Sequence, residues 1–288
     1  MESKNNLYII NLNELMNTEI YYFSGTGNSL HVAKELEKRI PNTSLIPIIS
    51  VLQKNNKIAS KSENAGIIFP IHALDIPWPV KEFIKKIDLS STSYIFAIST
   101  RECFSKVFSK IDKILAKQGK SLNASLSFEM PQSYIPVFEI YSDEKVKNVE
   151  SKMLKLLDSF QEIIKSRKTF RKKDSKAWFF LSNVIYPIIT AYYQKVRFPN
   201  MERSFFSTSD CTACGICEKV CLSNKIKLEN NKPIWQEKIK CTYCFACLHF
   251  CPTQSIQIKG RDTDEKGRYH HPQINVKDIM NQKKAYSN

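Results

Sequence analysis

The chain has 288 residues, of which 42% are hydrophobic and 25% charged, a composition ordinary for a globular protein. Its length excludes a single very small domain and suits one medium domain with one small one. With 43 Lys and Arg against 28 Asp and Glu, the formal net charge is +15, which favours acidic partners. The N-terminus lacks a signal peptide's apolar core and cleavage site, so we expect reduced cysteines and a cytoplasmic location.

Residues 1–18 are expected to be an N-terminal extension, and residues 19–167 an α/β domain. In this domain, apolar runs of strand length alternate with apolar residues at helical spacing. Helices are predicted over about 30–40, 80–87, 104–115 and 146–163. The alternation predicts a flavodoxin-like, doubly wound parallel sheet. Its five expected strands are Glu19–Phe23, Leu45–Ile49, Gly66–Phe69, Tyr94–Ile98 and Leu122–Met130.

A short loop between the first strand and the first helix has the character of a phosphate site. Backbone N–H groups at a helix N-terminus suit an anion, and hydroxyl groups add donors. Neither G-x-x-x-x-G-K-S/T nor G-x-G-x-x-G is present, which favours a monophosphate over a nucleoside triphosphate or a dinucleotide. An ordinary strand–helix turn is the alternative. The loop residues are Ser24, Gly25, Thr26, Gly27, Asn28 and Ser29.

Residues 168–203 are expected to be a basic and aromatic connector. Seven of the twelve residues from Lys165 to Lys176 are Lys or Arg, and an apolar aromatic stretch follows from Trp178 to Tyr193. That stretch is shorter than the ~20 apolar residues of a spanning helix. We expect it to pack against one or both domains. A peripheral membrane contact through residues 165–193 is the alternative.

Eight of the nine cysteines form two C-x2-C-x2-C-x3-C runs, and the second run is followed by Pro252. This spacing is typical of a ferredoxin domain with two [4Fe–4S] clusters, expected here over residues 204–260, with a tail over 261–288. In such runs the fourth cysteine ligates the other cluster. Zinc is the alternative, but four thiolates saturate a zinc ion without a third C-x2-C step. The expected ligands are Cys211, Cys214, Cys217 and Cys251 for cluster one and Cys241, Cys244, Cys247 and Cys221 for cluster two.

Residues 19–167 resemble a flavodoxin, whose FMN-phosphate loop reads T/S-x-T-G-N-T/S. Together with the cysteine runs, they make the chain similar to the EFR-type flavodoxin–ferredoxin fusion proteins. The resemblance implies FMN, with a second flavin loop after the third strand, a Met-Pro-x-x-Tyr segment over 130–134 and a tail motif over 268–272. The third loop, residues 100–103, lacks the glycines of the family, and a histidine replaces the usual tyrosine of the second loop. Besides the phosphate loop, the implied flavin contacts are Pro70, His72, Thr100 and Arg101.

The expected function is therefore electron transfer between FMN and two [4Fe–4S] clusters, with redox proteins, acidic ones in particular, as partners. An FMN-dependent reductase of an organic acceptor and a ferredoxin on a flavin-free α/β scaffold are the alternatives. No acid–base constellation indicates catalytic residues, and no aromatic-basic motif indicates nucleic-acid binding. Metal ligation is not expected for the histidines His31, His249, His270 and His271.

Overall fold

The structure is a computed structural model, and it describes residues 17–53, 58–101, 106–171 and 185–284. Most of the expected N-terminal extension, Cys103, and the stretch over 172–184 therefore lie outside the described residues. In the part of the chain described, no helix combines the length and the apolar character needed to cross a membrane.

A parallel sheet forms the centre of the larger domain, with strand order β2-β1-β3-β4-β5-β6. The first five strands follow the flavodoxin-like order 2-1-3-4-5, which confirms the predicted fold class. The sixth strand was not expected; it has two residues, and it extends the sheet beyond residue 167. The strands are β1 (Thr18–Tyr22), β2 (Thr43–Pro47), β3 (Asn64–Pro70), β4 (Tyr94–Arg101), β5 (Ala124–Glu129) and β6 (Phe170–Arg171).

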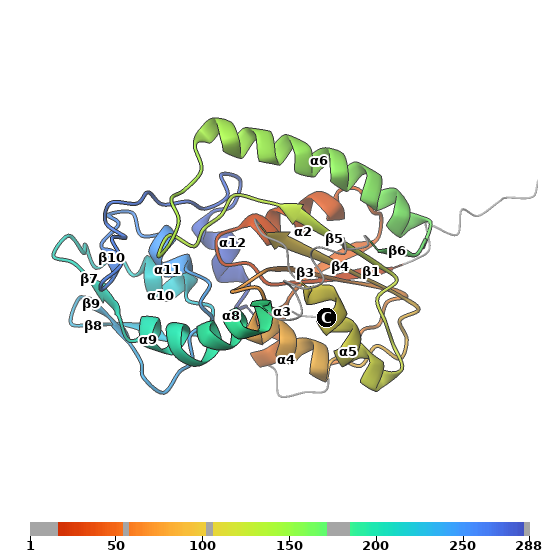
Figure 1. Cartoon of the computed structure of the whole chain (residues 1–288), viewed down its shortest axis with the longest axis horizontal. Coiled ribbons are helices and arrows are strands. Elements are labelled where there is room, and N and C mark those ends of the chain that lie inside the picture. Colours follow the sequence, from red (N-terminus) through yellow and green to blue (C-terminus); the bar gives the residue numbers. More distant parts are fainter. Residues whose placement is uncertain (1–16, 54–57, 102–105, 172–184, 285–288) are drawn as a thin grey trace, which may run out of the picture.

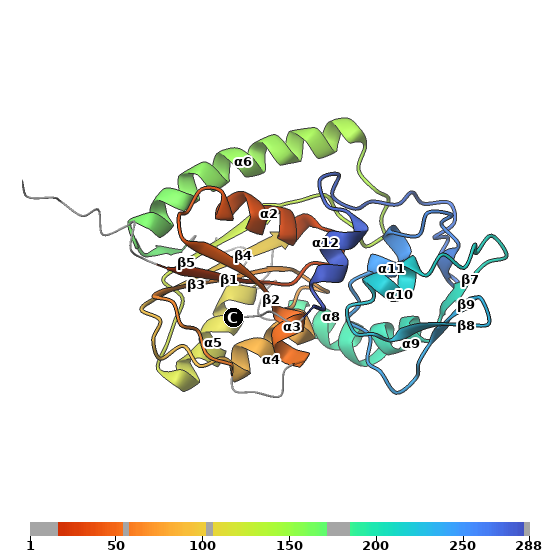
Figure 2. The same ribbon diagram turned by 180° about the vertical axis from the view of Figure 1, so that it is seen from behind.

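Helices cover both faces of the sheet, so the central strands are buried and read as continuous apolar runs. On one face lie α2 (Asn28–Glu37) and α6 (Asp143–Lys165) (Figures 1 and 2). On the other lie α3 (Ile48–Gln53), α4 (Trp78–Lys86) and α5 (Val107–Leu115), which the turn η1 (Ala116–Gln118) follows. The second expected strand ends two residues early, because Ile48 and Ile49 begin α3.

The smaller domain lies beyond one end of the sheet (Figure 1). Its strands pair antiparallel, β7 (Phe205–Ser207) with β10 (Ile256–Ile258) and β8 (Ile226–Glu229) with β9 (Lys232–Trp235). Its short helices, α10 (Ile216–Val220) and α11 (Ala246–His249), occupy equivalent places in the two cysteine runs. Each run also has positive φ angles at the residues before and after its second cysteine, which are Ala213, Gly215, Tyr243 and Phe245.

Two further segments join the domains. One is α8 (Tyr186–Tyr192), the π-helical turn η3 (Tyr193–Arg197) and α9 (Phe198–Glu202); it packs beside the junction. The other is the tail with α12 (Val276–Asn281), which returns to the α/β domain. Lys34 Nζ on α2 lies 2.6 Å from Asp278 Oδ1 on α12, and Ile279 belongs to the α/β core. Leu222 directly follows the fourth cysteine of the first run, a position where proline is common, and it is buried in that same core.

Candidate cofactor sites

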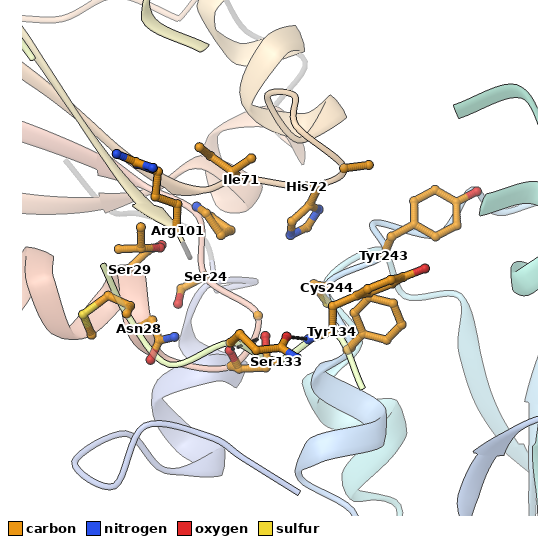
Figure 3. Close-up of a pocket in the computed structure, with 18 of the residues that line it drawn as sticks. Ser24, Asn28, Ser29, Ile71, His72, Arg101, Ser133, Tyr134, Tyr243 and Cys244 are labelled. Carbon is orange, nitrogen blue, oxygen red and sulfur yellow. Dashed lines mark hydrogen bonds between the residues drawn. The ribbon is translucent and has the colours of Figure 1, made fainter. Parts of the chain in front are cut away.

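A cavity of about 290 Å³ lies where the carboxyl ends of the strands meet the smaller domain (Figure 3). Doubly wound sheets bind ligands at this edge. The loops after β1, β3, β4 and β5 form one side of the cavity, and the connector and the second cysteine run form the other. All but one of the predicted flavin contacts line it, namely Ser24, Gly25, Thr26, Asn28, Ser29, Pro70, His72, Thr100 and Arg101. Gly27 is not among the lining residues.

The backbone of the predicted phosphate loop is arranged for an anion. Gly27 is the N-cap residue of α2, with a φ of 101°, a conformation that favours glycine. Among the described residues, none accepts a hydrogen bond from the backbone N–H groups of residues 25–29. Gln282 holds the start of the loop, since Ser24 N donates to Gln282 Oε1 at 3.0 Å and Gln282 Nε2 donates to Ser24 O at 2.8 Å. The unpaired donors at this helix N-terminus fit a phosphate.

The side chains of Asn28 and Ser29 contact other parts of the protein, whereas that of Ser24 does not. Both polar atoms of the Asn28 side chain form hydrogen bonds within the protein. Its Nδ2 donates to Pro131 O and its Oδ1 accepts from Tyr269 OH, both at 2.8 Å. Its role is to hold the loop in place. Ser29 Oγ lies 2.7 Å from Thr100 Oγ1, which ties the phosphate loop to β4. The hydroxyl group of Ser24 stays available to a ligand, as no described side chain or backbone group pairs with it.

The loop glycines also permit contacts between parts of the chain. A Cβ atom on Gly25 would lie 2.2 Å from Cys244 O, and one on Gly27 would lie 2.9 Å from the Cβ atoms of His271 and Ile274. Such distances are too short for a side chain. From the sequence, the only reason for these glycines was the bound anion. The structure shows a second reason, which is the close approach of the second cysteine run to Gly25 and of the tail to Gly27.

The walls beyond the phosphate loop suit a flat aromatic ligand. Ile71 and His72 come from the loop after β3, and Tyr134 and Tyr243 lie across the cavity from them (Figure 3). Apolar and aromatic walls of this kind are usual for cofactor sites. Burial lowers the pKa of His72 to about 4, so this imidazole is neutral at pH 7. Arg101 ends β4 at the edge of the cavity, and its backbone carbonyl accepts from Met130 N at 3.0 Å.

The first predicted cysteine quartet comes together in space. Four cysteines, three from the first run and one from the second, line a single small pocket. Burial, together with the nearby Cys214, Cys251 and Cys211, raises the pKa of the Cys217 thiol to about 11. Because Cys251 joins the first three, the crossed grouping expected from the spacing is present in the fold.

The second quartet is grouped in the same crossed way. Burial and the neighbouring Cys244 and Cys221 raise the pKa of the Cys241 thiol. Burial and the neighbouring Cys221, Cys241 and Cys244 likewise raise the pKa of the Cys247 thiol. Cys221 of the first run therefore lies near Cys241, Cys244 and Cys247 of the second, as the predicted crossed ligation requires. Two crowded sets of four thiols are the donor sets that [4Fe–4S] clusters require.

The two quartets differ in where they lie. Cys244 of the second quartet lines the large cavity, and Trp78 Nε1 on α4 donates to Cys241 O at 2.8 Å. The second quartet thus lies against the cavity that the predicted flavin contacts line. In the first quartet Cys214 is exposed.

Part of the cavity was missed by sequence reasoning. Ile189, Tyr193 and Phe198 of the connector and Phe245 of the smaller domain line it. Arg197 Nε donates to Tyr134 OH at 3.1 Å, which fixes one aromatic wall. The aromatic content of the connector was the one available signal, and it indicated packing without a location.

Comparison with known protein families supports the assignment of the smaller domain as an iron–sulfur domain. Residues 210–256 match the family model described as a 4Fe-4S dicluster domain. No curated protein sequence matches the chain.

Solved structures resemble about half of the chain. Rubredoxin oxygen:oxidoreductase from Desulfovibrio gigas has 10% identity and a TM-score of 0.31 over 50% of this chain and 36% of its own, so the chain spans about a third of that protein. An FMN-dependent NADH-azoreductase from Bacillus anthracis, in complex with FMN, has 10% identity and a TM-score of 0.33 over 50% and 99%. The Trp repressor binding protein from Bacillus subtilis has 13% identity and a TM-score of 0.32 over 49% and 97%. The chain joins an α/β domain with flavodoxin-like strand order to an iron–sulfur domain of ferredoxin type.

Proposed function

We propose that this protein transfers electrons between two [4Fe–4S] clusters and FMN, as a member of the EFR-type flavodoxin–ferredoxin fusion proteins. One observation carries the proposal. A single cavity is lined both by the anion-binding loop of the α/β domain and by Cys244 of the second cysteine quartet. A cofactor bound there would lie beside a cluster without any rearrangement of the domains.

The residues present fit FMN. The backbone N–H groups of residues 25–29 would bind its phosphate, and the hydroxyl group of Ser24 would add a donor. Its ring would lie between Ile71 and His72 on one side and Tyr134 and Tyr243 on the other. When bound, a flavin accepts or donates electrons singly or in pairs, and each cluster exchanges one electron at a time.

The placement of the quartets suggests a direction for the path. The second quartet lies against the cavity, and the first includes the exposed Cys214. We therefore assign the first quartet to exchange with partner proteins and the second to exchange with the flavin. The net charge of +15 favours an acidic redox protein as the partner. We expect this exchange to take place in the cytoplasm.

The cavity favours a carrier over an FMN-dependent reductase of an organic acceptor. Its volume of about 290 Å³ is near the lower end of ligand pockets, roughly 300 Å³. A flavin bound there would occupy most of this space.

Anaerobic purification with quantitation of iron, sulfide and flavin tests the proposal. We expect roughly eight irons and one FMN per chain. Cys221→Ser should lose the iron of the second cluster although it lies in the first run, and Cys244→Ser should do the same. Cys103→Ser, outside both runs, is the matched control and should keep all the iron. Zinc in place of iron would contradict the proposal, and iron without flavin would leave a ferredoxin on a flavin-free scaffold.

A further inference from the structure

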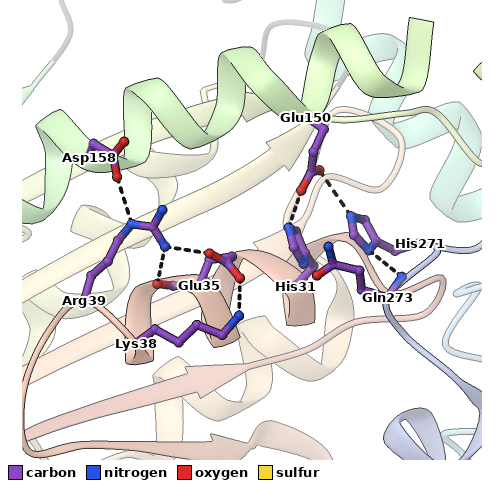
Figure 4. Close-up of polar contacts among 8 residues, drawn as sticks. All are labelled: His31, Glu35, Lys38, Arg39, Glu150, Asp158, His271 and Gln273. Atoms are coloured by element: carbon purple, nitrogen blue, oxygen red, sulfur yellow. Dashed lines mark hydrogen bonds and ion pairs between the residues drawn. The ribbon is translucent and has the colours of Figure 1, made fainter. Parts of the chain in front are cut away.

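Two histidines and a glutamate from three distant segments meet on the face of the sheet covered by α2 and α6. His31 belongs to α2, Glu150 to α6 and His271 to the tail (Figure 4). His31 Nε2 lies 2.6 Å from Glu150 Oε1, and His271 Nε2 lies 3.2 Å from Glu150 Oε2. One ligand atom from each residue lies within 4.8 Å of the other two.

The environment of this His–Glu–His cluster is that of a ligand set. His31 and His271 are 2% and 3% exposed, and their rings stack with centroids 3.8 Å apart, so one ring must turn for both Nε2 atoms to bind the same ion. His31 Nε2 is buried, and its close contact is the Glu150 carboxylate oxygen at 2.6 Å. The Glu150 side chain is 22% exposed, which leaves an open path to solvent.

The ionisation of the cluster suits a cation. Burial raises the pKa of Glu150, but the two imidazoles outweigh burial and hold that pKa at about 2. Burial lowers the pKa of His271, which favours the neutral imidazole that binds metals. Gln273 N donates to His271 Nδ1 at 3.3 Å, so Nε2 carries the proton when no metal is bound. On binding, that proton would move to Nδ1, and the ring would give up this one weak contact.

We propose that His31, Glu150 and His271 bind a divalent transition-metal ion, with Zn²⁺ as the best match. Two imidazoles and one carboxylate, with a fourth position open to water, form a known zinc ligand set. This proposal replaces the expectation that His31 and His271 bind no metal, and it does not depend on the flavin or the clusters.

The bound ion would connect the tail to the phosphate loop. His271 N donates to Thr26 O at 2.8 Å, and Gly27 packs against the His271 side chain. An ion held by α2, α6 and the tail would therefore fix the loop from behind. Such an ion would restrain three segments that meet only in the folded chain.

Zinc content and X-ray absorption test the site in the anaerobically purified full-length protein, after washing with a chelator and equilibration with Zn²⁺. We expect one added zinc per chain with only nitrogen and oxygen neighbours at about 2.0–2.2 Å. His31→Gln and His271→Gln should weaken binding at least about tenfold, and His270→Gln, at the adjacent histidine, should not. Zn²⁺ should raise the melting temperature of the wild type and not that of His31→Gln.

Any of the following results would overturn the proposal. They are no zinc above that of His31→Gln, sulfur neighbours at about 2.3 Å, which would place the zinc at the cysteines, and equal binding by all variants. If the histidine variants lose iron or fail to fold, Glu150→Gln decides, because it keeps the shape of the side chain and removes its charge. Zinc binding by Glu150→Gln as tight as that of the wild type would also exclude the site.

Discussion

Gly25 is the residue at which the phosphate loop and the second cysteine run touch. Its backbone approaches Cys244 so closely that even a methyl group has no space. The neighbour is backbone, which cannot rotate away as the end of a side chain can. A single residue therefore sets how closely the predicted phosphate loop approaches the second quartet.

Gly25→Ala should push these two segments apart. We expect destabilisation of about 1–3 kcal/mol, the usual cost of overpacking, and loss of bound flavin. Gly267→Ala is the control, because its new methyl group would meet only the end of the Ile140 side chain. Urea unfolding with flavin quantitation measures both variants. Equal stability and flavin content in Gly25→Ala and the wild type would show that the contact is not as close as described.

Asp75 holds the loop that carries His72. Its carboxylate is buried, and it accepts from Lys110 Nζ at 2.7 Å, Lys81 Nζ at 3.1 Å and Gln194 Nε2 at 2.7 Å. Burial raises the pKa of Asp75, but the bond and charge of Lys110, with the charge of Lys81, bring it below its usual value. A carboxylate with a lowered pKa in the folded state stabilises the fold above its unfolded pKa.

Asp75→Asn should lower the free energy of unfolding by about 1–3 kcal/mol at pH 7. The deficit should stay constant down to about pH 5 and shrink below about pH 4, as Asp75 of the wild type becomes protonated. Unfolding followed by circular dichroism at several pH values measures it. Asp158→Asn, at an exposed ion pair, is the control and should change stability by less than about 1 kcal/mol. A deficit that grows on acidification would contradict the assignment.

Among the elements, α12 and the tail support other parts of the chain, although α12 has only six residues. It packs on both domains, and Gln282 behind it is fully buried. The side chain of Gln282 satisfies the N–H and the C=O of Ser24 at once. The tail thus supports the phosphate loop from the side opposite the cavity.

Gln282→Ala would leave both backbone groups of Ser24 buried and unpaired. The cost should be about 1–3 kcal/mol for each group, so flavin content and stability should both fall. Iron content should fall less, since both cysteine quartets keep their surroundings. Gln273→Ala, at an exposed side chain of the same tail, is the control. Unchanged flavin binding in Gln282→Ala would mean that the loop holds its shape without the tail.

The elements also show how far sequence alone could lead. The five main strands were predictable because burial on both faces leaves continuous apolar runs. Helix α3 and strand β6 were not, since six and two residues carry no usable periodicity. The crossed cysteine quartets followed from spacing. The walls given by Tyr193 and Phe245 and the meeting of His31 with His271 depend on how distant segments pack, which no local pattern encodes.

At the scale of the whole molecule, charge is the most unusual property. The excess of 15 positive charges creates a field that attracts acidic proteins over distances comparable to the Debye length. The exposed Cys214 places the first quartet where such a partner could approach.

Electron exchange with an acidic ferredoxin should therefore slow as salt is added. We expect roughly a tenfold fall in the second-order rate between low and high ionic strength, because screening weakens the attraction. Stopped-flow absorbance measures it, and an uncharged chemical reductant is the control. A rate independent of salt would rule out electrostatic recognition of this partner.

We propose that one cavity joins a flavin to the second cysteine quartet. The most direct test is a crystal structure of anaerobically purified protein, with iron located by anomalous scattering. We expect FMN between residues 24–29 and Tyr134, and the cluster nearer to it held by Cys241, Cys244, Cys247 and Cys221. Zinc at the cysteines, an empty cavity, or the cluster of Cys211, Cys214, Cys217 and Cys251 as the nearer one would contradict it.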